Sequence, residues 1–371
     1  MKQNDHSTAQ HSTAQHSTAQ HSTAQHSTAQ NNYKTNSIDL FKLFFAFCVV
    51  AIHTQLLKDF SESINWYITH LIFRLAVPFF FVASGYFYAN KFLPTSEDKT
   101  KRMEVCKSFI TKLLPPFIVF SAIGLIFYAI PLFLQKDNIL IIIIIKLCRT
   151  AIFYPRGAMW YIAATMLAVF IFSKFWEKRK LLTLIAIISY FFALLCNSYY
   201  FLIADTPIAI VINNYMYIFI SARNGIGVGL IFVGIGIWLA LNKSKFEKKS
   251  TKTIAIMFFF AYFLLILEVI HTFRKPVLDD SSLFISMPLV SVLLFELTKR
   301  IIMPYTNATS VLLRKLSIYI YFLHPVFNSI ITLFSFDIKH TIIYTIVTLL
   351  CLLSWFIFRN NNKPYVKRIL P

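Results

Sequence analysis

The stretch IDLFKLFFAFCVVAIHTQLL, residues 38–57, decides the fold, because a mostly apolar run of about 20 residues can cross a bilayer as a helix. Asp39, Lys42 and His53 place ionisable side chains in it. At about 100° per residue, Lys42 and His53 lie on one helix face, about 16 Å apart along the axis, and Asp39 falls within about 40° of that face. Such groups are costly in lipid unless they face a polar cavity or pair with one another. The pattern therefore predicts a functional interior face.

The composition extends this prediction to the whole chain. Of 371 residues, 57% are hydrophobic and 17% aromatic, and only 14% are charged, which indicates an all-α polytopic membrane protein. The formal charge of +20 is carried largely by short loops between apolar spans, so we interpret it as a signal for orientation and expect membrane lipids, and no nucleic acid, as partners. The five cysteines occur singly, without the spacing of a metal site, and no metal is expected.

The N-terminus is a tail of different character. Residues 6–30 are five tandem copies of HSTAQ, a polar repeat that has nothing to bury, and we expect residues 1–34 to be disordered. An uninterrupted CACAG tract would encode this pentapeptide, and a five-base unit is not a multiple of three. Our hypothesis is that slippage in such a tract switches expression on and off, as in phase variation of bacterial surface-modifying genes. A protein-level repeat without a role is the alternative.

The rest of the chain is predicted to form about ten transmembrane helices with both termini cytoplasmic, because the loops between alternate segments carry the lysines and arginines. The segments are 38–57, 69–89, 113–134, 157–175, 180–199, 224–242, 252–271, 282–302, 309–331 and 341–359. They form one domain, 35–360, followed by a short cytoplasmic tail, 361–371. The apolar run 138–154 is short and holds two basic residues, so we expect an interfacial or re-entrant helix on the outer face, and we also place 200–222 outside.

With this topology, polar groups from separate segments fall at the outer ends of the helices: His53, Arg74, Arg156, Arg223, Glu268, His271 and His324. We interpret this as a polar chamber in the outer half of the membrane. Ser317, Tyr321 and His324 add spacing evidence, because positions i, i+4 and i+7 form one stripe of a helix, and Pro325 can kink that helix. Trp160 and Tyr161 lie close to Arg156 in sequence.

Each of these residues also has a structural interpretation. Lys42 can extend its ammonium to lipid head groups. Arg156 and Arg223 lie next to helix starts and can be interfacial anchors. Glu268 and His271, three residues apart, can form a structural hydrogen bond.

At these residues the chain resembles the acyltransferase-3 family of ten-helix membrane O-acyltransferases, which move acyl groups, often acetyl, from coenzyme A to sugars of bacterial surface polymers. The resemblance covers about residues 35–360. It is carried by Lys42 and His53, which match R/K-x10-H, and by RLAVPFFFVASG (74–85), which matches an arginine followed by VPxFFxxSG. GAMWYIAA (157–164), RNGIGVGLIFVGIG (223–236) and SIYIYFLHP (317–325) agree more weakly. Many relatives have a histidine just ahead of the tryptophan of GAMWYIAA, where this chain has Ala158 and Met159.

The resemblance implies acyl transfer from acetyl-CoA, or another acyl-CoA, to a hydroxyl of a glycan or lipid-linked sugar at the bacterial inner (plasma) membrane, with no permanently bound cofactor. It implies His53 as the base or transient acyl carrier, oriented by Glu268 or Asp39, and Arg74 as the oxyanion or acceptor clamp. Lys42, with Asp39, would bind coenzyme A, with Lys101 and Arg102 assisting. The expected substrate-binding residues are Arg156, Trp160, Tyr161, Arg223, Ser317, Tyr321 and His324.

Other functions remain open from the sequence. A proton-coupled transporter or flippase of a small polar substrate would also use intramembrane Lys, Arg, Glu and His residues, and a related variant is the membrane half of amino-acid racemase fusions, thought to supply serine. A lipid-binding or assembly subunit without catalysis would tolerate the loss of His53.

Overall fold

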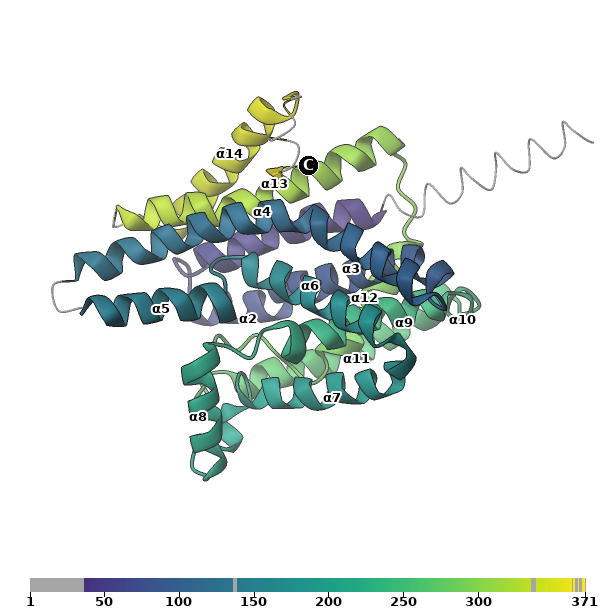
Figure 1. Ribbon diagram of the computed structural model, residues 1–371, viewed down its shortest axis with the longest axis horizontal. Coiled ribbons are helices and arrows are strands. Elements are labelled where there is room, and N and C mark those ends of the chain that lie inside the picture. Colours follow the sequence, from purple (N-terminus) through teal and green to yellow (C-terminus); the bar gives the residue numbers. More distant parts are fainter. Residues whose placement is uncertain are drawn as a thin grey trace, which may run out of the picture.

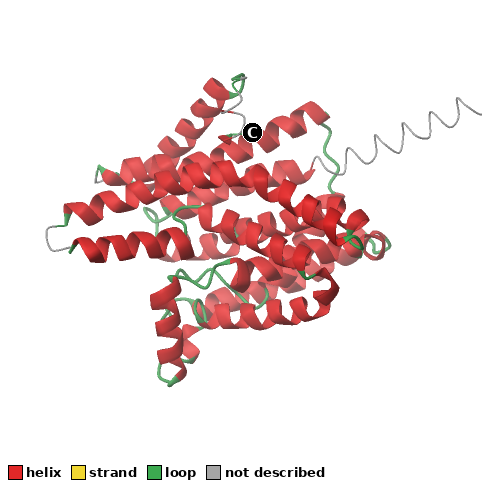
Figure 2. Cartoon of the chain, viewed as in Figure 1, coloured by secondary structure: helices red, strands yellow, loops and turns green. Residues whose placement is uncertain are grey.

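The computed structural model describes residues 37–135, 139–334 and 338–361, together with 363, 366, 369 and 370. This part of the chain is built from helices and connecting loops, and no strand occurs in it (Figure 2). The predicted disorder of residues 1–34 lies outside the described residues, as does much of the predicted tail 361–371.

The first described helix, Ser37–Thr54, is called α1 below, and Figure 1 labels most of the others. The α-helices that follow are α2 (Glu62–Leu71), α3 (Ala76–Phe92), α4 (Lys99–Leu134), α5 (Leu140–Phe153), α6 (Met159–Lys174), α7 (Arg179–Leu195), α8 (Ile208–Phe219), α9 (Leu230–Leu241), α10 (Lys243–Glu247), α11 (Thr251–Thr272), α12 (Met287–Arg300), α13 (Asn307–Leu333) and α14 (His340–Phe358). Short turns of other type are η1 (Phe73–Leu75), η2 (Leu93–Thr95), η3 (Trp176–Lys178), η4 (Tyr200–Leu202) and the π-helical η5 (Gly225–Gly229).

The protein is a helical multi-pass membrane protein. Each of the ten predicted segments overlaps a helix, and among the described residues six helical stretches are both long and apolar enough to cross a bilayer by themselves. They are Ser37–Thr54, Glu62–Thr95, Lys99–Leu134, Thr251–Thr272, Asn307–Leu333 and His340–Phe358. The ten-span count and the orientation of the termini stay predictions.

The second spanning stretch is interrupted between α2 and α3. Pro78 lies in the first turn of α3, where its missing N–H costs nothing, but its ring would clash with the carbonyl of Arg74 if the helix continued backwards unbroken. The chain therefore forms η1, a single tight turn, around Arg74. This break sets the position of the arginine beside the site described below.

The third spanning helix begins earlier than its apolar run. The sequence predicts a span from residue 113, but α4 begins at Lys99, where the Asp98 side chain accepts hydrogen bonds from the N–H groups of Thr100 and Lys101. The basic segment expected to be a loop is thus the first part of this helix.

The two ambiguous segments are short helices. α5 runs back along one end of α4 and, with 14 residues, is about 21 Å long, which is too short to cross the hydrocarbon core (Figure 1). α8 stands across the direction of most other helices (Figure 1). The expectation that neither segment spans the membrane stays a prediction.

α3 and α9 form the closest helix pair of the core. A Cβ atom on Gly85 would lie 2.3 Å from the carbonyl oxygen of Val233, and one on Gly236 would lie 2.2 Å from that of Val82. Each helix therefore presents a glycine to the backbone of the other, an approach that no larger residue allows. We call this glycine contact between α3 and α9 the glycine seam. Because α3 directly follows η1 and α9 directly follows η5, the seam fixes the two turns relative to each other.

A smaller apolar cluster lies apart from the main core and joins α1, α13 and α14. Its buried members are Ala46, Val50, Ile320, Val347 and Cys351. The turn after α1 is joined to the start of α14 by Asp59, whose carboxylate accepts hydrogen bonds from the N–H groups of His340 and Thr341.

Candidate active site

A cavity of about 400 Å³ opens where α1, η1, η5 and the loop before α12 meet. Its charged, imidazole and indole lining groups are His53, Arg74, Arg156, Trp160, Arg223 and Asp280. Five of these six were predicted from the sequence as site residues, and they come from several segments of the chain, with Arg156 and Trp160 in the same one. The structure thus brings the first two motifs, around His53 and Arg74, to one cavity.

His53 lies in the last turn of α1. The helix ends at Thr54, and Gln55, which also lines the cavity, takes a left-handed backbone conformation with φ of +52°. The His53 ring lines the cavity and is accessible from it. Its ring centroid is 5.2 Å from that of His324 on α13.

His324 is fully buried, and its two ring nitrogens differ. Nδ1 lies 2.9 Å from the carbonyl oxygen of Ile320, which accepts but cannot donate, so this contact assigns the proton to Nδ1. Nε2 then carries a lone pair, and it has no hydrogen-bond partner among the described residues. A buried acceptor is therefore left next to the His53 ring.

A cluster of four charges forms the opposite wall. Asp280 Oδ2 accepts hydrogen bonds from Arg74 Nη1 at 2.8 Å and from Arg223 Nη1 at 2.6 Å. Arg223 also binds Asp279 through two bonds, of 2.8 Å from Nη2 and 3.1 Å from Nε. Two guanidinium groups and two carboxylates balance in formal charge, which offsets the cost of burying them.

The carboxylate at the centre of this cluster stays ionised. Burial by itself raises the pKa of Asp280, but the guanidinium groups of Arg223 and Arg74 outweigh this effect and hold the pKa well below its usual range. The loop that carries Asp280 is held by Asn197, whose side-chain oxygen accepts hydrogen bonds from the N–H groups of Ser282 at 2.6 Å and Leu283 at 3.0 Å.

Aromatic rings cover the remaining face of Arg223. Its guanidinium carbon lies 5.4 Å from the ring centroids of both Tyr154 and Trp160, within the range of a cation–π contact. η5 begins directly after Arg223, and the side chain of Asn224 accepts hydrogen bonds from the N–H groups of Ile226 and Gly227 at its start. The position of Arg223 at the cavity wall is thus set by its ion pairs and by these rings.

Other predicted substrate-binding residues support the cavity without lining it. Tyr161 shares a hydrogen bond of 2.9 Å with Ser84 of α3, and Tyr321 donates to the carbonyl of Ala158. Ser317 donates to the carbonyl of Arg314, one turn back in its own helix.

Glu268 does not lie in the cavity, which contradicts the expectation that it orients His53. Its carboxylate accepts hydrogen bonds from the N–H group of Ser286 at 3.2 Å and from the hydroxyl of the same residue at 2.9 Å, and so joins α11 to the start of α12. His271 lies against the ring of Phe201 at 5.7 Å.

Lys42 and Asp39 occupy the other end of α1 and also lie outside this cavity. Lys42 Nζ is 3.4 Å from the Asp39 carboxylate and 4.6 Å from the centroid of the Phe87 ring. Asp39 also accepts a hydrogen bond of 2.6 Å from Ser310 and has Arg314 at 3.9 Å, so it does not orient His53. The shared helix face predicted from spacing holds, but it is divided between two polar sites.

Arg102, which was expected to assist coenzyme A binding, is instead buried and bonded to other parts of the protein. Its side chain is 1% exposed, and it donates to the carbonyls of Ser173 at 2.8 Å and Ser96 at 2.6 Å and binds the carboxylate of Glu177. With these partners it has little capacity to bind a ligand.

Sequence reasoning missed the two aspartates of the cluster and Tyr154. Asp279 and Asp280 stand in LDDSS, which looks like an ordinary polar loop. One signal could have found them: the chamber was predicted to hold several arginines, and buried guanidinium groups require carboxylate partners.

The chain is similar in sequence to parts of curated proteins from two Enterococcus species. The serine/alanine racemase of Enterococcus gallinarum is 29% identical over 307 residues, which are 79% of this chain and 40% of that protein. An amino-acid racemase of Enterococcus faecalis is 29% identical over 203 residues, or 53% of this chain and 26% of that protein. The chain thus matches less than half the length of these relatives. No solved structure shows significant similarity.

A family model matches residues 35–359, nearly all of the chain after the repeat tail, and its description is an acyltransferase domain. The cavity with its histidine and arginines lies inside the matched region. The chain therefore belongs to the acyltransferase-3 family of membrane acyltransferases.

Proposed function

We propose that this protein transfers an acetyl or other acyl group from coenzyme A to a hydroxyl of a surface or exported glycan, at the bacterial inner membrane. The observation that carries the proposal is the cavity in which His53 lies opposite the paired guanidinium groups of Arg74 and Arg223. O-acyl transfer needs a base for the nucleophile and positive charge near the oxyanion, and these residues supply both.

His53 acts as the base, with His324 as its positioning residue. The bare Nε2 of His324 can accept an N–H from the neighbouring His53 ring, which leaves the other nitrogen of His53 unprotonated toward the cavity. That nitrogen takes the proton of the acceptor hydroxyl as its oxygen attacks the thioester carbonyl. When the tetrahedral intermediate collapses, the C–S bond breaks, and the proton passes to the departing thiolate of coenzyme A.

The oxyanion is stabilised by Arg74. Its Nη1 is committed to Asp280, and its side chain lines the same cavity as His53. A donor that is already oriented by an ion pair adds stabilisation without a cost for reorganisation. Arg223 keeps both carboxylates in place and so holds Arg74 at the required position.

The donor is proposed to approach from the cytoplasmic end, where Lys42 lies on the same helix as His53, about 16 Å away. Lys42 is only partly committed to Asp39, at 3.4 Å, and its ammonium can bind a phosphate of coenzyme A. The acyl thioester then reaches His53 from the cytoplasmic side, and the acceptor reaches it from the outer side.

The proposal is tested with the purified chain in lipid nanodiscs and acetyl-CoA carrying a labelled acetyl group. We expect acetyl-CoA turnover to fall by about 10²–10⁴-fold in His53→Ala, because a positioned base contributes about this much. His271→Ala, which changes a histidine outside the cavity, is the matched control. Turnover that persists in His53→Ala refutes the assignment.

The same preparation separates the enzyme from a transporter. Two curated relatives carry the word racemase in their names, so labelled serine is included as a flux substrate. Serine or sugar flux that proceeds without any acyl donor, and survives in His53→Ala, would support transport instead. Loss of acetyl groups from the cell-envelope glycan in a deletion strain, restored by the intact gene, would identify the acceptor.

A further inference from the structure

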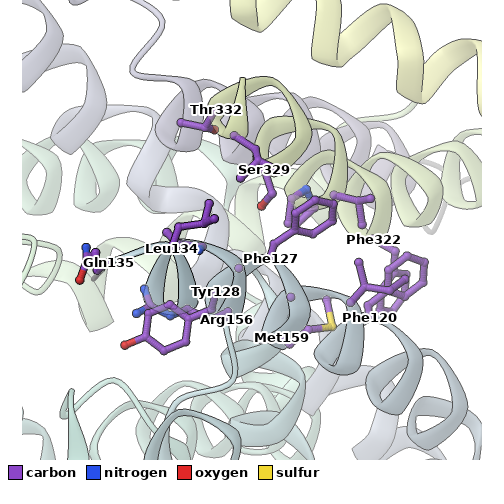
Figure 3. A pocket seen from close by; sticks show the side chains of 17 residues that line it. Phe120, Phe127, Tyr128, Leu134, Gln135, Arg156, Met159, Phe322, Ser329 and Thr332 are labelled. Carbon is purple, nitrogen blue, oxygen red and sulfur yellow. The ribbon is translucent and has the colours of Figure 1, made fainter. Parts of the chain in front are cut away.

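A second cavity of about 650 Å³ lies between α4 and α13, beside the first, and the mechanism does not use it. Its walls are largely apolar, with the rings of Phe120 of α4 and Phe322 of α13 next to each other at one end and Leu134 at the end of α4 (Figure 3). It is an open groove, bounded by two of the spanning helices, and its size falls in the range of ligand sites, about 300–1,000 Å³.

The groove and the active-site cavity share two lining residues, Arg156 and Gly157. Gly157 has a φ of +65°, and a Cβ atom on it would come within 2.8 Å of the Pro325 ring, so this turn requires a glycine. The turn places Arg156 at the junction, and its guanidinium stacks on the ring of Tyr128 with 3.8 Å between the guanidinium carbon and the ring centroid. Figure 3 shows Arg156 and Tyr128 together at the edge of the groove.

Arg156 differs from the other arginines of the active-site cavity. Arg74 and Arg223 are paired with carboxylates, whereas no carboxylate of the described residues lies within ion-pair distance of Arg156. A cation is thus left without a counter-ion at the point where an apolar groove meets the catalytic cavity. The ligand that complements this arrangement carries a hydrocarbon chain, an anionic group next to it, and a polar part beyond.

We propose that the groove between α4 and α13 binds the lipid anchor of the acceptor, with the phosphate that links lipid and sugar at Arg156 and the sugar hydroxyl in the cavity at His53. This inference rests on the proposed function and specifies its acceptor as a lipid-linked sugar. The charge of Arg156 selects a lipid phosphate over a neutral lipid, and the shared lining places the linked sugar in the same cavity as His53.

The test uses geranylgeranyl phosphate with a diazirine in its terminal isoprene unit, added to the full chain in nanodiscs and activated by light. Mapping of the labelled peptides is expected to place the crosslinks in residues 120–134 and 322–333. Arg156→Gln should lower the labelling about tenfold, as expected for the loss of one charge-assisted contact with a phosphate. Arg179→Gln, which removes an arginine from the far end of the molecule, should not change it.

A second variant keeps the charge and blocks the groove. A Cβ atom on Gly124 would lie 3.4 Å from the Cβ of Arg156, so Gly124→Leu projects its side chain into the junction. It should reduce labelling as Arg156→Gln does. Circular dichroism and gel filtration check that both variants fold.

Competition between the probe and unlabelled ligands identifies what the groove binds. Unlabelled geranylgeranyl phosphate should displace the probe, while geranylgeraniol, which has the same chain without the charge, should need about tenfold more. Equal competition by the neutral alcohol would show an ordinary lipid-facing surface, and displacement by palmitoyl-CoA would assign the groove to the donor. Displacement by inorganic phosphate alone would show a site for the anion only. Each of these three results overturns the proposal.

The labelling and turnover experiments together distinguish an error in the lipid-site proposal from an error in the proposed function. His53→Ala should keep the labelling and lose acetyl-CoA turnover. Labelling elsewhere, with turnover still dependent on His53, rejects only the lipid site. Correct labelling with turnover independent of His53 rejects the catalytic assignment and leaves a lipid-phosphate site.

Discussion

Substitution of Asp280 by asparagine is the sharpest perturbation of the charge cluster. The change keeps the shape of the side chain but removes the charge that both Arg74 and Arg223 share, at 2.8 and 2.6 Å. Removing one partner of a buried ion pair costs about 3–5 kcal/mol, because a charge is left uncompensated. Arg223 retains both bonds to Asp279, and the Asp280 side chain is 32% exposed, so we expect a loss of about 2–3 kcal/mol in the free energy of unfolding.

The loss is measured by denaturant unfolding in detergent, followed by tryptophan fluorescence. Arg74→Gln and the double variant complete a thermodynamic cycle, and the coupling energy between Asp280 and Arg74 should be about 1–3 kcal/mol. Glu247→Gln, which removes an exposed carboxylate 4.0 Å from Lys243, is the control and should cost at most about 0.5 kcal/mol. Additive losses in the cycle, or a loss in Asp280→Asn no larger than in the control, would refute this account of the cluster.

Three further changes have defined outcomes. Gly236→Ala should destabilise the protein by about 1–3 kcal/mol in the same unfolding assay, because its Cβ would lie 2.2 Å from the carbonyl of Val82; an unchanged midpoint would contradict the backbone contact. Arg102→Gln should lower stability and leave the KM for acetyl-CoA unchanged, whereas a raised KM would restore its predicted role with the donor. The hydrogen bond from the N–H of Thr341 lowers the pKa of the Asp59 carboxyl. Protection of the Thr341 amide from hydrogen exchange should therefore persist from pH 7 to about 4, where an unfolded aspartate begins to protonate, and should be lost only at lower pH. Loss of this protection above pH 4 would show that Asp59 has the pKa of an ordinary carboxyl.

The fold was largely predictable because spanning helices are long, apolar and bounded by basic loops. The break at η1 was also implicit in Pro78, since proline cannot continue a helix from the preceding turns. The early start of α4 was not, because the polar turns before residue 113 are helical by virtue of the Asp98 cap and the burial of Arg102, neither of which hydropathy records.

The gathering of residues around one cavity could be predicted where helix period and depth are sufficient, whereas their roles stay predictions. His53, Arg74 and Arg223 were placed in one chamber by counting residues along helices. Glu268 could not be placed in this way, because depth in the membrane does not say which way a side chain points around the helix axis. The partners Asp279 and Asp280 lie in a loop, whose path depends on tertiary contacts such as those of Asn197.

The glycine seam between α3 and α9 has a consequence for how substrates are admitted. Because each helix holds a carbonyl where the other would place a Cβ atom, the two cannot slide or roll, and the arginines just ahead of them keep a constant separation. The imidazoles stand on α1 and α13, which share the smaller apolar cluster with α14. Any adjustment of the chamber to a substrate is therefore expected in the histidine-bearing helices, because the arginine-bearing frame has no room to shift.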